Sequence, residues 1–303
     1  MEGRRLVPAV SFAVKNAFTL LRRIEKVLKG VRAGKGNKPV HQLRVNSRRL
    51  RNIVKLFQGV FPSRLFKKNL KNIKLLAKSA SAARDLDVQI QFLKDYKKKL
   101  KTRVEIPDIK NFIQTLQQDR CQLQPRIVRA VDLFKKKKVL LQLGRSLKRI
   151  NAQAKRSASI GIYELLKAEL LKQGNALLAL ESFAAQPTKV KELHQMRIAA
   201  KHLRYSLECL RPLYDQQLLS YWQEVLRFHR QLGEIHDYDV WMERLSTMTK
   251  ETAGKRSQAL VSFQDFCRKN RQQAYQTFFR NWQRAREQRI FEDLLGYFYA
   301  YHG

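Results

Sequence analysis

The chain has 303 residues, 44% of them hydrophobic, so it can bury a sizeable core and disorder as its main state is excluded. Its 62 Lys and Arg outnumber its 25 Asp and Glu, and the resulting formal net charge of +37 repels itself unless anions neutralise it. Glycine (12) and proline (7) are scarce and good helix formers abound, which excludes a sheet-rich fold. We therefore expect an all-α protein with a polyanionic partner.

Apolar residues recur with the 3.6-residue period of amphipathic helices along most of the chain. In the first half, this period predicts helices over residues 8–29, 38–58, 63–82 and 84–103. In the second half, it predicts helices over residues 158–182, 189–211, 215–232 and 237–252. Between the two series, connecting helices are expected over 108–156, broken at Pro107 and Pro125.

The charge is unevenly distributed between the two halves of the chain, and the cysteines indicate the cellular compartment. Residues 1–150 carry a net charge of +30, whereas residues 151–303 carry +7. The three cysteines lie far apart, without a CxxC pair, and an odd number cannot form a closed set of disulfides. We therefore expect a protein of the reducing cytoplasm. No apolar run reaches 18 residues, so no membrane insertion is expected.

Two motifs occur twice, in the same order. The segment His41-Gln-Leu-Arg44-Val aligns with His194-Gln-Met-Arg197-Ile, and further on Asp85-Leu-Asp87-Val aligns with Asp237-Tyr-Asp239-Val. Because both motifs recur at nearly the same separation, chance is a poor explanation. The repeat predicts two helical bundles related by a pseudo-twofold axis. Residues 1–150 would form the first, with the connecting helices, and residues 151–303 the second.

The first repeated motif predicts a helix with one apolar and one cationic face. At 100° per residue, the basic side chains of the 38–58 helix fall within an arc of about 80°. Its apolar side chains fall on the opposite side, where a bundle core would bury them. The first cationic stripe consists of His41, Arg44, Arg48, Arg51 and Lys55, and the second of His194, Arg197, Lys201 and Arg204.

Repetition argues against reading the stripes as ordinary solvated faces. Like charges at i,i+3 and i,i+4 destabilise a helix by roughly 0.2 to 0.5 kcal/mol per pair, and no acidic residue interrupts the first stripe. Arginine forks and lysine ammonium groups suit phosphate oxygens. The leading histidine of each stripe donates from one ring nitrogen when neutral and from both when charged. The second stripe is shorter, because Glu208 stands where the first has Lys55.

The paired aspartates and the histidines leave an alternative open. The aspartates are expected to cap helix N-termini and to hold nearby arginines, as a scaffold for the stripes. Metal binding between carboxylate and phosphate is the competing interpretation. His194, His229 and His236-Asp237 also resemble, weakly, the metal cluster of HD-type phosphohydrolases, but Arg84 replaces His236 in the first copy. We expect no metal site and no catalytic residue.

At His41-x-x-Arg44-Val and His194-x-x-Arg197-Ile, each followed by further basic residues, the sequence resembles the CHAD family, the conserved histidine α-helical domain. The Asp-x-Asp-Val segments belong to the match, which covers nearly the whole chain. The resemblance implies two four-helix bundles with pseudo-twofold symmetry that bind inorganic polyphosphate along a basic surface without catalysis. The ExExK start of the CYTH domain, often fused to this family, is absent, so a stand-alone member is expected.

Three functions compete on this evidence. The leading one is polyphosphate binding, with targeting to polyphosphate granules and no cofactor. A nucleic-acid-binding protein is the alternative, because +37 attracts DNA or RNA through counterion release. A metal-dependent phosphohydrolase comes third. The candidate polyphosphate-binding residues are His41, Arg44, Arg48, Arg49, Arg51, Lys55, Lys71, Lys74, Lys78, His194, Arg197, Lys201, His202, Arg204, Arg227 and Arg230.

Overall fold

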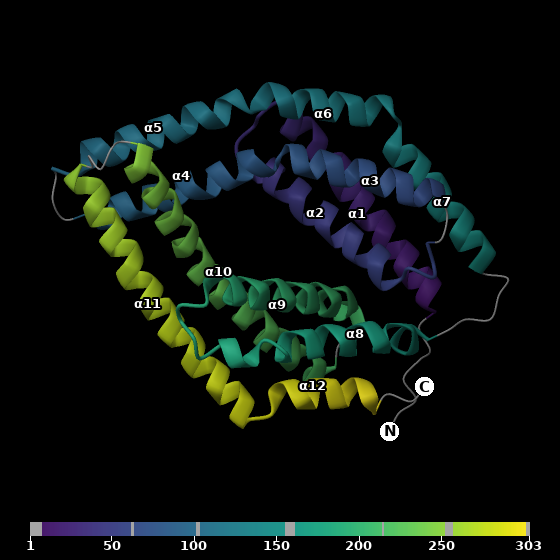
Figure 1. The fold of residues 1–303 in the computed structure, drawn as a ribbon. Coiled ribbons are helices and arrows are strands. Elements are labelled where there is room, and N and C mark those ends of the chain that lie inside the picture. Colours follow the sequence, from purple (N-terminus) through teal and green to yellow (C-terminus); the bar gives the residue numbers. More distant parts are fainter. Residues whose placement is uncertain are drawn as a thin grey trace. The chain divides into compact units, whose positions relative to one another are not determined.

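The computed structural model describes residues 8–61, 64–100, 104–154, 161–213, 215–251 and 257–300 of the chain. In this part of the chain the regular structure is helical, and one isolated β-bridge joins Pro8 to Gly161. The all-α fold class expected from composition is therefore confirmed. Two compact units can be distinguished, residues 1–165 and 166–303, and each is described by itself (Figure 1). None of the described helices is long and apolar enough to cross a membrane.

Helices α1 to α7 belong to the first unit. Their bounds are α1 Ala9–Arg32, α2 Lys38–Leu56, α3 Arg64–Ser79, α4 Ser81–Lys99, α5 Ile106–Gln122, α6 Gln124–Lys136 and α7 Val139–Ala154. The connecting helices expected over 108–156 are present as α5 to α7. Pro107 and Pro125 stand in the first turns of α5 and α6, where a missing N–H costs nothing.

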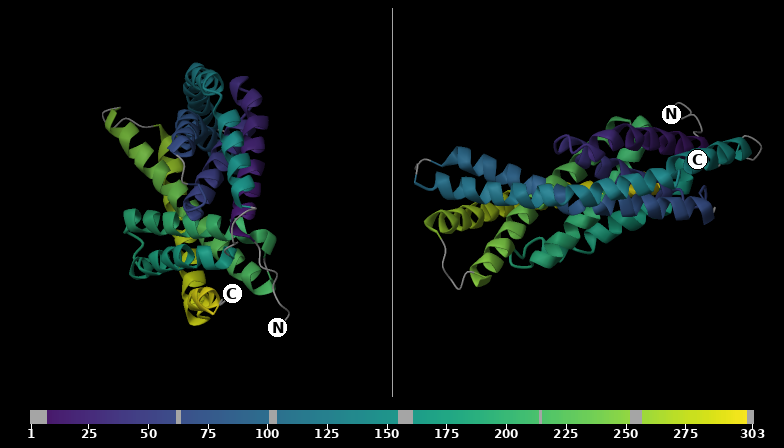
Figure 2. Two further views of the ribbon diagram at one scale, coloured as in Figure 1. Left: turned by 90° about the vertical axis from the view of Figure 1, so that its right-hand side faces the viewer. Right: turned by 90° about the horizontal axis from the view of Figure 1, so that it is seen from above.

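The core of the first unit is built on the apolar side of α1. Leu20, Leu21 and Ile24 are at most 5% exposed, and α1 packs against α2, α6 and α7. Burying each such side chain contributes roughly 1.5 to 3 kcal/mol. Helices α4 and α5 pack side by side as a neighbouring antiparallel pair, which the right-hand view of Figure 2 shows from above.

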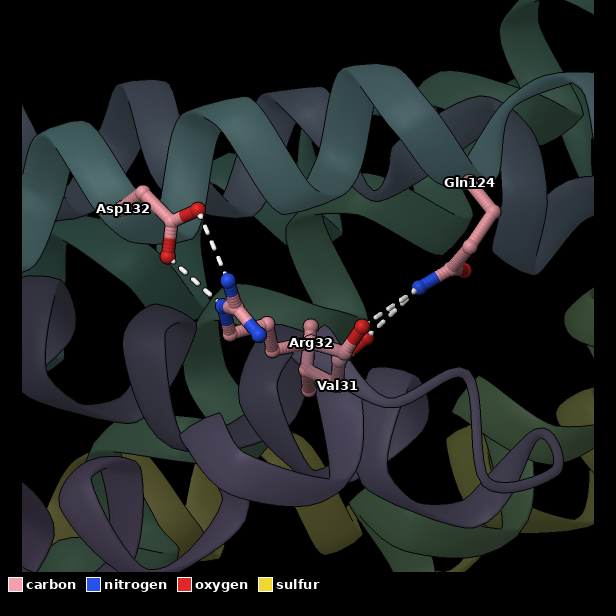
Figure 3. A network of polar contacts seen from close by, with 4 residues as sticks. All are labelled: Val31, Arg32, Gln124 and Asp132. Carbon is pink, nitrogen blue, oxygen red and sulfur yellow. Dashed lines mark hydrogen bonds and ion pairs between the residues drawn. The ribbon is translucent and has the colours of Figure 1, made fainter.

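Contacts at the end of α1 fix the turn that leads into α2. Gly34 has φ of +65°, a left-handed conformation that favours glycine. Gln124 at the start of α6 donates hydrogen bonds of 3.0 and 3.1 Å to the carbonyl oxygens of Val31 and Arg32, which lack partners within α1 (Figure 3). Arg32 also donates to Asp132 of α6 at 2.7 Å. Together these hydrogen bonds tie the end of α1 to α6.

The second unit holds most of α8 and everything after it. Its elements are α8 Ile162–Leu178, η1 Glu181–Phe183, α9 Val190–Leu210, η2 Arg211–Leu213, α10 Gln216–Glu251, α11 Gln258–Glu287 and α12 Ile290–Tyr299. Helix α10 packs against α9, α11 and α12. An aromatic core forms where these helices meet, with Phe228 of α10 within 5.3 Å of Trp282 and 5.6 Å of Phe291, measured between ring centroids.

One helix boundary expected from the sequence is wrong. Instead of two helices over 215–232 and 237–252, α10 runs unbroken from Gln216 to Glu251. Gly233 alone does not end a helix, because it costs only about 1 kcal/mol relative to alanine. Leu232 and Ile235 on either side of it are both 1% exposed, so the buried face continues through the expected break. In the first unit the corresponding stretch does break, at Ala80 between α3 and α4.

Candidate anion-binding site

Helix α2 carries the first stripe on the side away from the core of its unit. Leu43 and Leu50 are fully buried and Ile53 is 4% exposed, as the helical period predicts. The basic residues lie at the surface. His41 and Lys55 are exposed, whereas Arg44, Arg48, Arg49 and Arg51 are half-buried.

Arg44 is held in place by α4. Its Nη2 lies 3.6 Å from Oδ1 of Asp85, the first aspartate of the repeated motif. Partial burial lowers the pKa of Arg44, Asp85 acts in the opposite direction, and Arg48 and Arg84 add to the lowering. Burial also lowers the pKa of Arg51, with Arg48 and Arg44 as further causes. Neighbouring cations thus disfavour one another's charged form, and a bound anion would relieve that cost.

Arg84 of α4 belongs to the same surface, although it is not among the residues expected there from the sequence. Partial desolvation is the largest cause of the lowered pKa of His41, and Arg84 is the largest charged cause, ahead of Arg44, Arg48 and Arg49. With its pKa below 6.5, the His41 ring is mainly neutral at pH 7 in the free protein. Arg84 therefore supplies a permanent cation next to a titratable one.

Helix α3 adds exposed lysines to the first unit. Its core side is formed by residues such as Ile73 and Leu76, which are at most 2% exposed, and it packs against α2 on one flank. The lysines expected to contribute to the site are all exposed, on the solvent side of the helix: Lys71, Lys74 and Lys78.

Helix α9 presents the second stripe. The apolar side of α9 is buried like that of α2, and Met196 and Leu207 on it are fully buried. The basic residues His194, Arg197, Lys201 and Arg204 are half-buried, and His202 is exposed. The Arg204 guanidinium lies 4.3 Å from the centre of the Tyr205 ring, a cation–π contact that holds its side chain near the helix.

Helix α10 places His236 directly against His194. The two Nδ1 atoms are 3.1 Å apart and the ring centroids 4.2 Å apart. Burial is the main cause of the lowered pKa of both rings, with Arg197 and Lys201 contributing, and the pKa of His236 falls to about 4. His236 occupies the position of Arg84 in the repeat. In each unit, then, a basic side chain from another helix, Arg84 of α4 or His236 of α10, lies near the histidine that leads the stripe.

The second aspartate of each motif forms a well-buried ion pair. Arg120 of α5 donates to Asp87 at 3.0 Å, and Arg271 of α11 donates to Asp239 at 2.6 Å. The expectation that these aspartates cap helix N-termini is wrong, because they lie inside α4 and α10. The expectation that they hold nearby arginines agrees with the structure. The pairs join α4 to α5 and α10 to α11. The repeat therefore extends to the helix that follows each Asp-x-Asp motif, α5 in the first unit and α11 in the second.

The arginines expected on the second unit's third helix lie on α10. Arg230 is exposed. Arg227 is exposed too, but it donates to Glu224 one turn earlier, so part of its charge is already compensated. The second unit therefore offers a weaker cationic surface beside its stripe than the lysines of α3 offer in the first.

Other charged features lie at helix ends. The Lys97–Lys99 run forms the last turn of α4, and Lys135 and Lys136 form the last turn of α6, where cations interact favourably with the helix dipole. In the part of the chain that the structure describes, no three or more His, Cys, Asp or Glu residues come together in a way that could hold a metal ion.

Comparisons with known proteins agree with this architecture. The family model described as the CHAD domain matches residues 17–246. The chain is similar to the crystal structure of the CHAD domain from the plant Ricinus communis, with 19% identity and a TM-score of 0.65 over 99% of this chain and 96% of that one. It is also similar to PptA from Streptomyces chartreusis, with 12% identity and a TM-score of 0.57 over 93% and 100% of the two chains. No curated protein matches the chain.

At these identities, the two solved structures speak to the fold alone. The family match goes further, because it covers most of the chain and includes both cationic stripes and both Asp-x-Asp motifs. The repeated sequence, the helical architecture and this match agree, and the chain belongs to the CHAD domain family.

Proposed function

We propose that this protein binds inorganic polyphosphate through its two cationic stripes and does not turn the polymer over. The observation that carries the proposal is the repeat itself: a row of basic side chains, most of them half-buried, lies on α2 and again on α9. Each row sits on a rigid helix whose other side is core, so its charges are aligned before any ligand arrives. Membership of the CHAD family supports the same ligand, since polyphosphate binding is what the family resemblance implies.

The chemistry of the stripes fits a chain of phosphates. Arg44, Arg48 and Arg51 offer planar forks that bind phosphate oxygens through paired, charge-assisted hydrogen bonds. Burial is the main cause of the lowered pKa of Arg44 and Arg51, and neighbouring arginines add to it. An anion that lies along the row offsets both effects, because it favours the charged form of each guanidinium. A polymer that carries a charge on every unit supplies such an anion at successive turns of the helix.

Nucleic acid is the second candidate, and the net charge of +37 is the observation that favours it. Single-strand binders stack bases on exposed aromatic rings among their basic residues. Tyr205 is the aromatic residue that adjoins the second stripe, but it is 6% exposed and Arg204 lies over its ring. A buried ring offers no platform for a base, so the stripe suits a ligand without bases better.

The proposed role is binding, in the cytoplasm, with targeting to polyphosphate granules as its use. Turnover is testable directly. We expect no phosphate release from polyphosphate or nucleotides above a buffer control, with Mg²⁺ or Mn²⁺ present. Release that disappears when His236 and Asp237 are both changed to Ala would contradict the non-catalytic part of the proposal.

A competition experiment tests the ligand. Labelled long-chain polyphosphate bound to the full chain is displaced by unlabelled polyphosphate, single-stranded DNA or double-stranded RNA, at equal phosphate concentration and physiological salt. We expect polyphosphate to displace the label at the lowest concentration. If either nucleic acid competes as well or better, the chain is a general polyanion binder or a nucleic-acid-binding protein, and the proposal fails.

A further inference from the structure

The contact between His194 and His236 gives the second stripe a property that the first lacks. The Nδ1 atoms of the two rings lie 3.1 Å apart, within hydrogen-bond distance, and the ring planes are tilted by 40°. Two nitrogens make such a bond only when one carries a proton and the other offers a lone pair. One proton therefore lies between the rings, donated by one Nδ1 and accepted by the other.

This bond determines what the remaining nitrogens offer. In the neutral pair, the ring that donates from Nδ1 has a bare Nε2, and the ring that accepts at Nδ1 has a protonated Nε2. One added proton goes to the bare Nε2 and leaves the shared bond intact, so the pair then has two Nε2–H donors. A second added proton would set two N–H groups against each other across 3.1 Å. The pair thus takes up one proton and no more.

The groups around the pair oppose that proton in the free protein. Arg197 and Lys201 of α9 lower the pKa of both rings, in addition to the effect of burial. On α10, Asp239 acts in the opposite direction on His194. Arg271 of α11 pairs with Asp239 and offsets its charge. In the free protein at pH 7 the pair is therefore neutral, with one donor and one acceptor outside the shared bond.

We infer that the His194–His236 pair binds one proton together with a phosphate anion and then donates two N–H groups to the phosphate oxygens. The inference rests on the proposed function and adds His236 to the binding residues. A phosphate beside Arg197 and Lys201 offsets the charges that oppose protonation, and it accepts hydrogen bonds but, when fully ionised, donates none. Phosphate and proton therefore favour each other's binding.

The direction of the pH dependence follows from this linkage. The ligand raises the pKa of the pair from its lowered free-state value, which is about 4 for His236. The added affinity is complete below the free-state pKa and is lost as pH rises through the bound-state pKa. One linked proton changes the affinity by at most about tenfold per pH unit. In the first unit, Arg84 stands in the place of His236 and is charged at every relevant pH, so that position contributes no such linkage.

Calorimetry of the full chain with long-chain polyphosphate tests the inference. Titrations at pH 6.5, in buffers that differ in ionisation enthalpy, give the number of protons taken up on binding. We expect wild type to take up more protons than His236→Arg, by up to one per chain. Arg84→His is the matched converse, and it should increase the uptake, because it gives His41 a histidine partner. Protons from His41 and from the polymer ends are common to wild type and His236→Arg and cancel in their difference.

The outcomes separate the inference from the function. If wild type and His236→Arg both bind polyphosphate and take up the same number of protons, the inference is wrong, but the proposed function is not affected. If wild type does not bind polyphosphate, the inference and the proposed function are both wrong. Circular dichroism checks that each variant is folded. If His236→Arg does not fold, His194→Gln removes the pair from the other side and should cause the same loss of proton uptake.

Discussion

Arg271 donates a 2.6 Å hydrogen bond to Asp239, and the two side chains are 12% and 9% exposed. The first unit repeats the pair with Arg120 and Asp87, whose side chains are 13% and 10% exposed. Arg271 also donates to the carbonyl oxygen of Pro187. These pairs fix α10 against α11 and α4 against α5, on helices that also carry His236 and Arg84. We interpret them as the supports of the binding surface.

Breaking the ion pair between Arg271 and Asp239 should lower the free energy of unfolding substantially. Asp239→Ala leaves the Arg271 guanidinium buried without its carboxylate, and such a loss typically costs about 3 to 5 kcal/mol of unfolding free energy. Urea denaturation at pH 7 measures it. Asp265→Ala is a matched control, because Asp265 pairs with Arg268 on the exposed side of α11, where the side chains are 65% and 63% exposed. The control should lose at most about 1 kcal/mol, and equal losses in both variants would contradict a supporting role for the buried pair.

The cysteines should differ sharply in reactivity. Cys121 is exposed, whereas burial raises the pKa of both Cys209 and Cys267 to about 12, so these two have almost no thiolate at pH 8. We expect a thiol-reactive dye to label the native protein rapidly at one position. Cys121→Ser should abolish this fast reaction, and the other two thiols should react only in denaturant. Rapid reaction of two or more thiols in the native protein would show that the cores around Cys209 and Cys267 open readily.

Affinity should depend on polyphosphate length. If one long polymer engages both stripes, the second contact benefits from effective concentration, by up to roughly 10² to 10⁴. Affinity per polymer should then rise steeply with length and level off. Changing Arg197, Lys201 and Arg204 to Ala should remove most of this rise and leave the binding of triphosphate-sized ligands to the first unit largely unchanged. Titrations of size-fractionated polyphosphates at fixed ionic strength measure it. The same length dependence in both proteins would show that the second stripe does not take part in binding the polymer.

Local periodicity predicted the helices and their buried faces well. The expected helix over 38–58 is observed as α2, Lys38–Leu56, because its apolar residues recur with a clear helical period. The break expected before residue 237 is absent because tertiary packing of Leu232 and Ile235 outweighs the low helix propensity of Gly233. The pseudo-twofold axis stays a prediction.

Contacts between helices were harder to predict. Arg84 and His236 align in the repeat, but a single sequence does not show that α4 and α10 bring them near the leading histidines. A signal for the buried ion pairs did exist: Arg120 follows Asp87 by 33 residues and Arg271 follows Asp239 by 32. Extending the repeat alignment beyond the Asp-x-Asp motifs would have found these arginines. Which carboxylate each one pairs with depends on the packing of two helices and required the structure.

The central claim is that the stripes, rather than the overall charge, bind polyphosphate. The most direct test reverses two charges in each of two places and compares polyphosphate affinity at physiological salt. The stripe variant is Arg44→Glu with Arg48→Glu, and the control is Lys135→Glu with Lys136→Glu, which changes the net charge by the same amount at the exposed end of α6. We predict a clearly larger loss of affinity for the stripe variant. Equal losses would mean that the field of a highly basic protein explains the binding, and the assignment of the stripes would be wrong.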